Sequence, residues 1–122
     1  MSINFSFRKL LLSFKYAGRG LVVLFKSQQN ALIHLLALVF VFALAWYLQL
    51  SKIEWLFIVL SVTMVIVAEA FNTAIEFLAD SISKEHHPLI GKAKDVAAGA
   101  VLLTAIMAVV VGILVFGPHL LA

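Results

Sequence analysis

Three long apolar runs dominate the chain, at residues 31–50, 55–78 and 96–117. A helix needs roughly 20 apolar residues to cross about 30 Å of hydrocarbon, and each run reaches that length. The pattern therefore predicts an all-α membrane protein with three transmembrane helices. Because residues 51–54 leave only a short link between the first two runs, we expect those two helices to form an antiparallel hairpin.

Residues 5–27 have a different pattern, in which basic side chains interrupt the apolar ones. At about 100° per residue, Arg8, Lys15, Arg19 and Lys26 fall within about 40° of one another on a helical wheel. The segment is too charged to span a bilayer and too apolar to be a solvated tail, so it predicts an amphipathic helix on the membrane surface. Electrostatic anchoring to anionic lipid is by itself a sufficient explanation of the basic face.

The composition agrees with a membrane protein, because 64% of the 122 residues are hydrophobic and only 12% are charged. The net charge is +3, and a chain of this length supports a single domain, residues 1–122. No cysteine is present, which excludes disulfides and thiolate metal sites. The basic residues gather before the first run and between the second and third. The positive-inside rule therefore predicts a cytoplasmic N-terminus and a cytoplasmic loop at 79–95.

A polar stripe interrupts the second run near its C-terminal end. Glu69, Glu76 and Asp80 lie within about 40° on one helix face, and Asn72 lies about 60° to the side. Counted from Trp55, Glu69 lies about 21 Å and Glu76 about 31 Å along the helix. Glu69 is then inside the hydrocarbon and Glu76 among the headgroups. An unpaired carboxylate at the depth of Glu69 costs at least ~2.5 kcal/mol, so the stripe needs a partner, a proton or a function.

Two interpretations of this polar stripe are open. A protonated Glu69 that hydrogen-bonds across a helix interface would be purely structural. The loop that follows carries Lys92 and Lys94, however, and carboxylates and ammonium groups are the side chains that hold Mg²⁺ and phosphate. We therefore favour a nucleotide site at the membrane surface, although the phosphate loops GxxxxGKS and GxGxxG do not occur in the sequence.

Other features of the spans have simpler interpretations. His34 and His119 lie near the ends of spans and are expected at the membrane interfaces rather than in catalysis. Small residues recur at every fourth position of the third span, which lets helices approach closely. They are Ala100, Thr104, Ala108 and Gly112. Three helices cannot enclose a polar site alone, so we expect the polar stripe to face another subunit.

Two motifs extend the pattern beyond single residues. AEAFNTAIEFLAD at 68–80 fits E-x-x-N-[ST]-A-[IL]-E-x-x-x-D, and EHHPLIGKAKD at 85–95 fits H-x-x-x-G-[KR]-[AG]-K-D. With these motifs the sequence resembles the prokaryotic diacylglycerol kinase family, small integral membrane lipid kinases that include the undecaprenol kinases. The resemblance runs over nearly the whole chain. It implies an N-terminal surface helix and three transmembrane helices in a homotrimer, with active sites shared between neighbouring subunits.

The resemblance also implies roles for individual residues. Glu69 corresponds to the general base that takes the proton from the lipid hydroxyl, and Glu76 to a ligand of the metal bound to ATP. The other positions that match nucleotide-contacting residues are Tyr16, Asn72, Glu85, His87, Lys94 and Asp95. ATP and Mg²⁺ are the implied co-substrate and metal. The implied location is a bacterial cytoplasmic (inner) membrane, with a lipid substrate and no nucleic-acid partner.

One position departs from the family pattern. The family usually has a second acidic metal ligand shortly before an Asn on the surface helix, and SQQN places Gln28 there, with Asn30 following. A glutamine offers Mg²⁺ a carbonyl oxygen but no negative charge. Either the metal is held by Glu76, ATP oxygens and water, or the enzyme is weakened.

The favoured function is phosphorylation of the hydroxyl of a membrane lipid alcohol by ATP, with diacylglycerol as the first acceptor and undecaprenol as the alternative. A second hypothesis is a catalytically silent membrane assembly protein that lost its chemistry through Gln28. A third is a proton or ion conduit. The conduit is disfavoured because the polar residues stop halfway through the second span, where residues 55–68 offer only Ser61 and Thr63.

Overall fold

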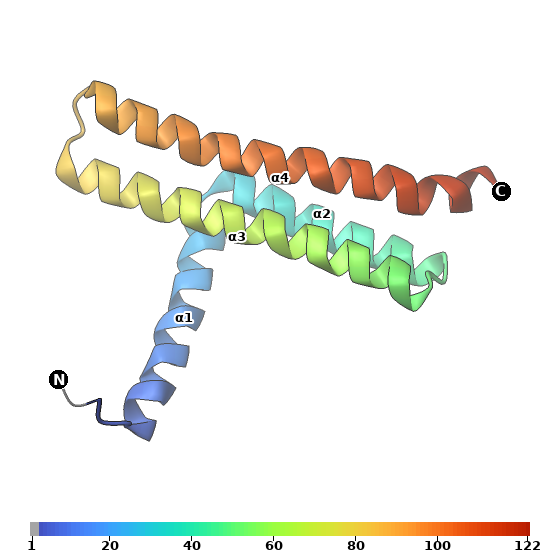
Figure 1. The fold of residues 1–122 in the computed structure, drawn as a ribbon, viewed down its shortest axis with the longest axis horizontal. Helices are drawn as coiled ribbons and strands as arrows, with labels where there is room; N and C mark the ends of the chain where they lie inside the picture. The colour runs from blue at the N-terminus through green and yellow to red at the C-terminus, as the bar shows by residue number, and fades with distance from the viewer. Residues whose placement is uncertain (1–2) are drawn as a thin grey trace.

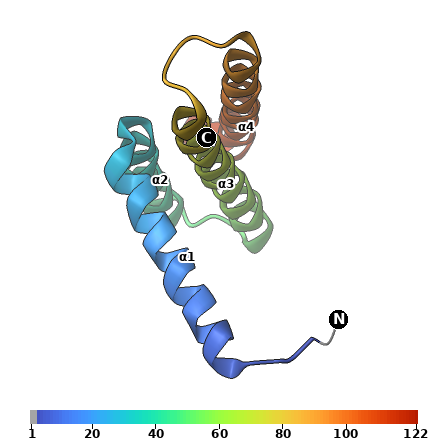
Figure 2. The ribbon, with the colours of Figure 1, turned by 90° about the vertical axis from the view of Figure 1, so that its left-hand side faces the viewer.

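The computed structural model describes residues 3–122, which form four helices joined by short links. Figure 1 shows α2, α3 and α4 side by side along the long axis, while α1 projects away from them at a steep angle. Seen from the end in Figure 2, α3 lies between α2 and α4. The helices are α1 (Phe7–Ser27), α2 (Gln29–Tyr47), α3 (Lys52–Ile82) and α4 (Pro88–Leu121).

Three of the four helices, α2, α3 and α4, are long and apolar enough to cross a membrane. This confirms the all-helical fold and the three candidate spans that the apolar runs predicted. With 31 and 34 residues, α3 and α4 are about 46 and 51 Å long at 1.5 Å per residue. Both exceed the roughly 30 Å of hydrocarbon, so each helix has turns to spare for the headgroup regions.

The α1–α2 junction consists of one extended residue. Gln28 has φ −120° and ψ 117°, and its backbone N–H still donates to the carbonyl oxygen of Leu24 at 3.3 Å. Leu24 and Ala31, on either side of the junction, are among the most buried residues of the chain. These two buried residues anchor the junction where the chain changes direction from α1 to α2.

The α2–α3 link is a tight turn closed by a capping box. Gln49 has a φ of 53°, in the left-handed region, which reverses the chain after α2. Ser51 Oγ accepts the backbone N–H of Glu54 at 3.2 Å, and Glu54 Oε1 accepts the backbone N–H of Ser51 at 3.1 Å. These two hydrogen bonds satisfy donors at the start of α3 that have no partner within the helix. As the short link predicted, α2 and α3 form an antiparallel hairpin.

A small hydrophobic core joins the three spans near this turn. Its buried members come from α2, the turn, α3 and α4, and they are Ala45, Leu50, Ile58, Val115 and Phe116. Most other large apolar side chains of the spans are exposed on the single chain. Such a surface suits a helix bundle whose outer faces meet lipid or other subunits.

The 79–95 segment, which the sequence predicted as a loop, is mostly helical. α3 continues to Ile82 and α4 begins at Pro88, so only residues 83–87 are non-helical. Pro88 and Gly91 indicated turns in the sequence. Proline is instead favoured at the first position of a helix, where its fixed φ fits and its missing N–H costs nothing. Gly91 lies within the first turns of α4, and Lys94 and Asp95 consequently lie on this helix.

The other observed bounds differ from the predicted ones by a few residues. α1 begins at Phe7 rather than at residue 5, after Ser6 Oγ accepts the backbone N–H of Lys9 at 3.3 Å. α2 begins at Gln29 and ends at Tyr47, and α4 extends through Pro118 to Leu121. These differences arise because hydrophobicity locates the apolar part of a helix, whereas caps and turns set its ends.

Candidate functional site

The second span, α3, carries the polar stripe that the sequence predicted. Glu69 is 5% exposed, which makes it the one carboxylate among the buried residues of the described chain. Asn72 and Glu76 follow at half-buried positions, and Asp80 is exposed close to the 83–87 link. The stripe therefore runs from the buried interior of the bundle to an exposed end within three turns of one helix.

Gln28 and Glu76 meet across the bend between α1 and α2. Gln28 Nε2 donates to Glu76 Oε2 at 3.4 Å, although the two residues are 48 positions apart. Both are partly buried. The two residues that the family resemblance assigned to the metal are thus brought together, with the amide of Gln28 where a second carboxylate was expected.

His34 lies against Glu69, and this neighbour was missed by the sequence analysis. His34 Nδ1 is 3.2 Å from Glu69 Oε1, within ion-pair distance, although Nδ1 makes no aligned hydrogen bond. His34 is the sixth residue of α2, near the start of the helix as the sequence analysis placed it, and its contact with Glu69 is the feature that the sequence did not show. An ionisable residue inside a span deserved a functional hypothesis on that ground alone.

Lys94 and Asp80 close the exposed end of the polar stripe. Lys94 Nζ donates to Asp80 Oδ1 at 2.7 Å, and the two side chains are 38% and 52% exposed. The contact links α4 to α3 close to the 83–87 link that joins them. Because α4 is helical from Pro88 onward, Lys94 lies six residues after its start, and its side chain reaches Asp80 on the polar stripe.

Asn72 presents an unsatisfied acceptor between α3 and α4. Its Oδ1 is buried and has no hydrogen-bond partner, and the same is true of Thr73 Oγ1. Asn72 and Lys92 line a cavity of 640 Å³ whose other walls are apolar side chains of the two helices. A buried polar atom without a partner is costly, so Asn72 is suited to a ligand or a further chain at this place.

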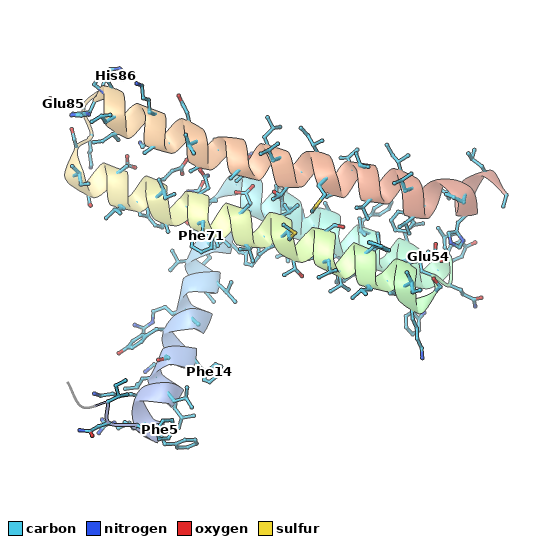
Figure 3. The ribbon with its side chains drawn as sticks, viewed as in Figure 1. Phe5, Phe14, Glu54, Phe71, Glu85 and His86 are labelled. Atoms are coloured by element: carbon cyan, nitrogen blue, oxygen red, sulfur yellow. The ribbon has the colours of Figure 1, made fainter. Side chains whose placement is uncertain are left out.

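Four residues implied by the resemblance stand apart from these contacts in the single chain. Tyr16 is exposed on α1, with the Arg19 guanidinium 5.7 Å from the centre of its ring. Glu85 and His87 lie in the exposed link, at the end of the α3–α4 hairpin where Figure 3 labels Glu85. Asp95 is exposed on α4. His87 Nδ1 accepts the backbone N–H of Leu89 at 3.2 Å, so this histidine also caps α4.

The residues around Glu76 fit a magnesium ion that arrives with a nucleotide. Mg²⁺ prefers oxygen ligands, keeps several waters and is commonly held by one or two carboxylates together with phosphate oxygens. Glu76 supplies one carboxylate and Asn72 an unpaired amide oxygen. Gln28 directs its amide nitrogen to Glu76, and the oxygen of the same amide would serve a cation if the group turned over. No cluster of three or more His, Asp or Glu side chains suited to a metal ion occurs among residues 3–122 of the single chain.

Comparison with known proteins identifies the family. The profile of the prokaryotic diacylglycerol kinases matches residues 15–116, a range that includes every site residue described above. The chain belongs to the prokaryotic diacylglycerol kinase family. The resemblance drawn from the motifs at 68–80 and 85–95 is thereby confirmed, and the chain is a lipid kinase.

Individual relatives of this lipid kinase family have two different names. The chain is 40% identical to the undecaprenol kinase of Bacillus subtilis over 108 residues, which cover 88% of each chain. It is 41% identical over 114 residues to a diacylglycerol kinase of Synechocystis, covering 93% of this chain and 65% of that protein. It is 31% identical to the diacylglycerol kinase of Escherichia coli K12 over 93% of each chain. The family is therefore established, and the acceptor lipid is a separate question.

Proposed function

We propose that this chain transfers the γ-phosphoryl group of ATP, in the presence of Mg²⁺, to the hydroxyl of a membrane lipid alcohol. The observation that carries this proposal is the order of groups along α3. A buried carboxylate at Glu69 comes first, the partly buried pair Glu76 and Gln28 follows, and the exposed pair Asp80 and Lys94 comes last.

This order suits a lipid that cannot leave the membrane and a nucleotide that cannot enter it. The hydroxyl of a lipid stays with its hydrocarbon tail, and a nucleotide stays in water. Glu69 and Glu76 are seven residues apart, or about 10 Å along the helix axis. A hydroxyl near Glu69 and phosphates near Glu76 would then meet at the boundary between the two media.

Glu69 is the proposed general base. Its carboxylate would take the proton of the lipid hydroxyl as the lipid oxygen bonds to the γ-phosphorus and the bond from that phosphorus to the ADP oxygen breaks. Asn72 would orient the reacting groups through its unpaired amide oxygen. Phosphoryl transfer requires little covalent chemistry from a protein, so positioning and neutralisation of charge supply most of the rate.

The other residues of the site would bind the nucleotide. Mg²⁺, when bound with ATP at Glu76, would neutralise charge on the phosphate oxygens. Lys94 offers an ammonium group that Asp80 holds in place at 2.7 Å. Tyr16, Glu85, His87 and Asp95 would contribute further contacts to ATP.

We propose a homotrimer with active sites shared between subunits. The unpaired Asn72 oxygen and the 640 Å³ cavity beside it support a further chain at this face. Exposed apolar side chains along the spans and the small residues of α4 support close helix packing between subunits. The positive-inside rule supports a cytoplasmic N-terminus and 83–87 link in a bacterial inner membrane.

Two acceptors are candidates, and a specific observation supports each. Undecaprenol is supported by 40% identity to an undecaprenol kinase over 88% of both chains. Diacylglycerol, which the sequence analysis placed first, is supported by 41% identity to the Synechocystis diacylglycerol kinase and 31% identity to that of E. coli. Both lipids present a primary hydroxyl at the interface, so the same base and the same nucleotide site serve either one.

The test is transfer of labelled phosphate from ATP with Mg²⁺ to each lipid in matched micelles. We expect turnover of at least one lipid, and a loss of roughly 10²–10⁴-fold in Glu69→Gln. Glu54→Gln is the matched control, because it makes the same chemical change at the opposite end of α3 (Figure 3). It should retain the parent rate under conditions where it is folded.

The outcomes separate the alternatives. Equal kcat/KM for the two lipids would remove any claim of selectivity between them. Turnover that survives in Glu69→Gln would remove this residue as the base. An absence of turnover with both lipids, together with an absence of Mg²⁺-dependent ATP binding, would instead support the catalytically silent assembly protein.

A further inference from the structure

The neighbour of the proposed base is a histidine from a different helix. His34 Nδ1 lies 3.2 Å from Glu69 Oε1, so the contact joins α2 to α3 below the nucleotide-binding end of the stripe. The Glu69 side chain is 6% exposed and that of His34 is 28% exposed. The imidazole therefore lies beside the carboxylate on one side and reaches the surface of the single chain on the other.

The other basic groups of the described chain do not pair with Glu69. Among residues 3–122, no other basic nitrogen lies within 4.0 Å of the Glu69 carboxylate. On α4, Lys94 is paired with Asp80, and Lys92 lines the neighbouring cavity. α1 presents the apolar residue Leu24 on the side that packs against α3. Among residues 3–122 of one chain, His34 is thus the one basic side chain within 4.0 Å of this carboxylate.

The ring nitrogen that faces Glu69 is free to receive a proton. His34 Nδ1 is buried and has no hydrogen-bond partner, so no other group competes for its lone pair. In a neutral imidazole with its proton on Nε2, Nδ1 is an acceptor. Histidine changes its protonation state between about pH 5 and 8 more readily than any other side chain, which suits it to repeated transfer.

A buried base needs such a neighbour in each catalytic cycle. Glu69 must lose the proton of one lipid hydroxyl before it can accept the next, and its burial leaves little contact with water. We propose that His34 is a positioning residue for Glu69 that also receives the proton which Glu69 takes from the lipid hydroxyl. This inference rests on the proposed function of Glu69 as the base.

The transfer balances without any further reactant. The lipid O–H bond breaks as the lipid oxygen bonds to the γ-phosphorus, and the proton passes to Glu69. It then passes from Glu69 Oε1 to His34 Nδ1. The imidazolium then rotates, releases the Nδ1 proton to water and returns, so that Nε2 keeps its proton and both residues regain their starting state. ADP leaves with the electron pair of the broken phosphorus–oxygen bond.

The same position offers contact with the lipid tail. His34 lies at a groove of 390 Å³ between α2, α3 and α4 whose other lining residues are apolar. A lipid whose hydroxyl reaches Glu69 would pass close to this ring. His34 therefore holds the base at the place where the hydroxyl arrives, which explains why a half-buried histidine occurs in an otherwise hydrocarbon-like helix.

The experiment measures kcat and KM against pH in the parent, His34→Gln and His34→Ala, with whichever lipid the parent phosphorylates. We expect kcat to fall by roughly 10²-fold in both variants while the KM for ATP changes by less than about twofold. The pH dependence of kcat in His34→Gln should differ from that of the parent, because glutamine cannot take up the proton. Added imidazole should restore part of the kcat of His34→Ala.

His119→Gln is the matched control, since it removes a histidine that faces a carboxylate at the other end of the bundle. It should keep the pH profile of the parent. A parental kcat and pH profile in His34→Gln, alongside an inactive Glu69→Gln, would overturn the role of His34 and leave the base assignment intact. If His34→Ala does not fold, His34→Gln retains the polar volume and decides the question. No turnover by the parent with either lipid would overturn both proposals.

Discussion

Gln28 Nε2 lies 3.4 Å from Glu76 Oε2, so the C-terminal end of α1 is joined directly to the middle of the polar stripe on α3. The side chain of Gln28 makes this contact. Its extended backbone turns the chain between α1 and α2, so that the side chain reaches α3. The one position that departs from the family pattern therefore contacts the proposed metal ligand Glu76.

Gln28→Glu should make the protein more dependent on Mg²⁺ and more responsive to it. A second carboxylate at 3.4 Å from Glu76 repels the first when no cation is present, and the two together attract a divalent cation. We expect a lower melting temperature in EDTA, recovery with Mg²⁺, and a several-fold lower concentration of Mg²⁺ at half-maximal kinase rate. Thermal unfolding and a Mg²⁺ titration of the rate measure these effects.

Gln29→Glu provides the matched control, because Gln29 is the next residue and is exposed. It adds the same charge without reaching Glu76. Identical Mg²⁺ dependence in Gln28→Glu and the parent would show that position 28 takes no part in holding the metal.

Lys94→Gln should weaken ATP binding more than it changes the stability of the fold. The Lys94–Asp80 pair is largely exposed, and such pairs contribute little to stability. We expect the KM for ATP to rise at least several-fold, with a smaller rise in Asp80→Asn, which leaves Lys94 charged but no longer held. Steady-state kinetics at varied ATP checks both.

Lys84→Gln is the control for this change, since Lys84 lies exposed on the link and is outside the ion pairs of the described residues. Its KM for ATP should stay within about twofold of the parent. If Lys84→Gln and Lys94→Gln raise the KM equally, the effect is a general loss of positive charge and not a contact to the nucleotide.

The opposite end of the bundle has its own contact, which should affect stability alone. His119 Nε2 lies 2.7 Å from Glu54 Oε2 and joins the end of α4 to the start of α3. Glu54 also completes the capping box with Ser51. We expect His119→Gln and Glu54→Gln each to lower the melting temperature in detergent, with less than additive effects in the double variant because they remove one shared contact.

The kinase parameters of these two variants should match the parent once they are folded, because the contact is at the far end of α3 from the stripe. Additive effects on the melting temperature would mean that the residues act independently. A change in the KM for ATP would show that the two ends of the bundle are coupled.

Hydrophobic periodicity and spacing were enough to predict much of this molecule. A run of apolar residues predicts a span because the favourable free energy of moving each side chain from water into the membrane adds up along the segment. This sum does not depend on what the segment packs against. The polar stripe could also be predicted, because the positions of Glu69, Glu76 and Asp80 on one helix face depend only on the helical repeat. The motifs that contain them were sufficient to indicate the family.

Only the tertiary structure decided which helices supply the partners of the polar stripe. Gln28, His34 and Lys94 come from the α1–α2 bend, α2 and α4, and each meets a different carboxylate of α3. Such contacts depend on the rotation and the register of one helix against another, which a repeat within a single helix does not specify. The same limit applies to the 79–95 segment. Its turn-forming residues correctly predicted that the chain reverses there, but the helix caps confine the reversal to residues 83–87.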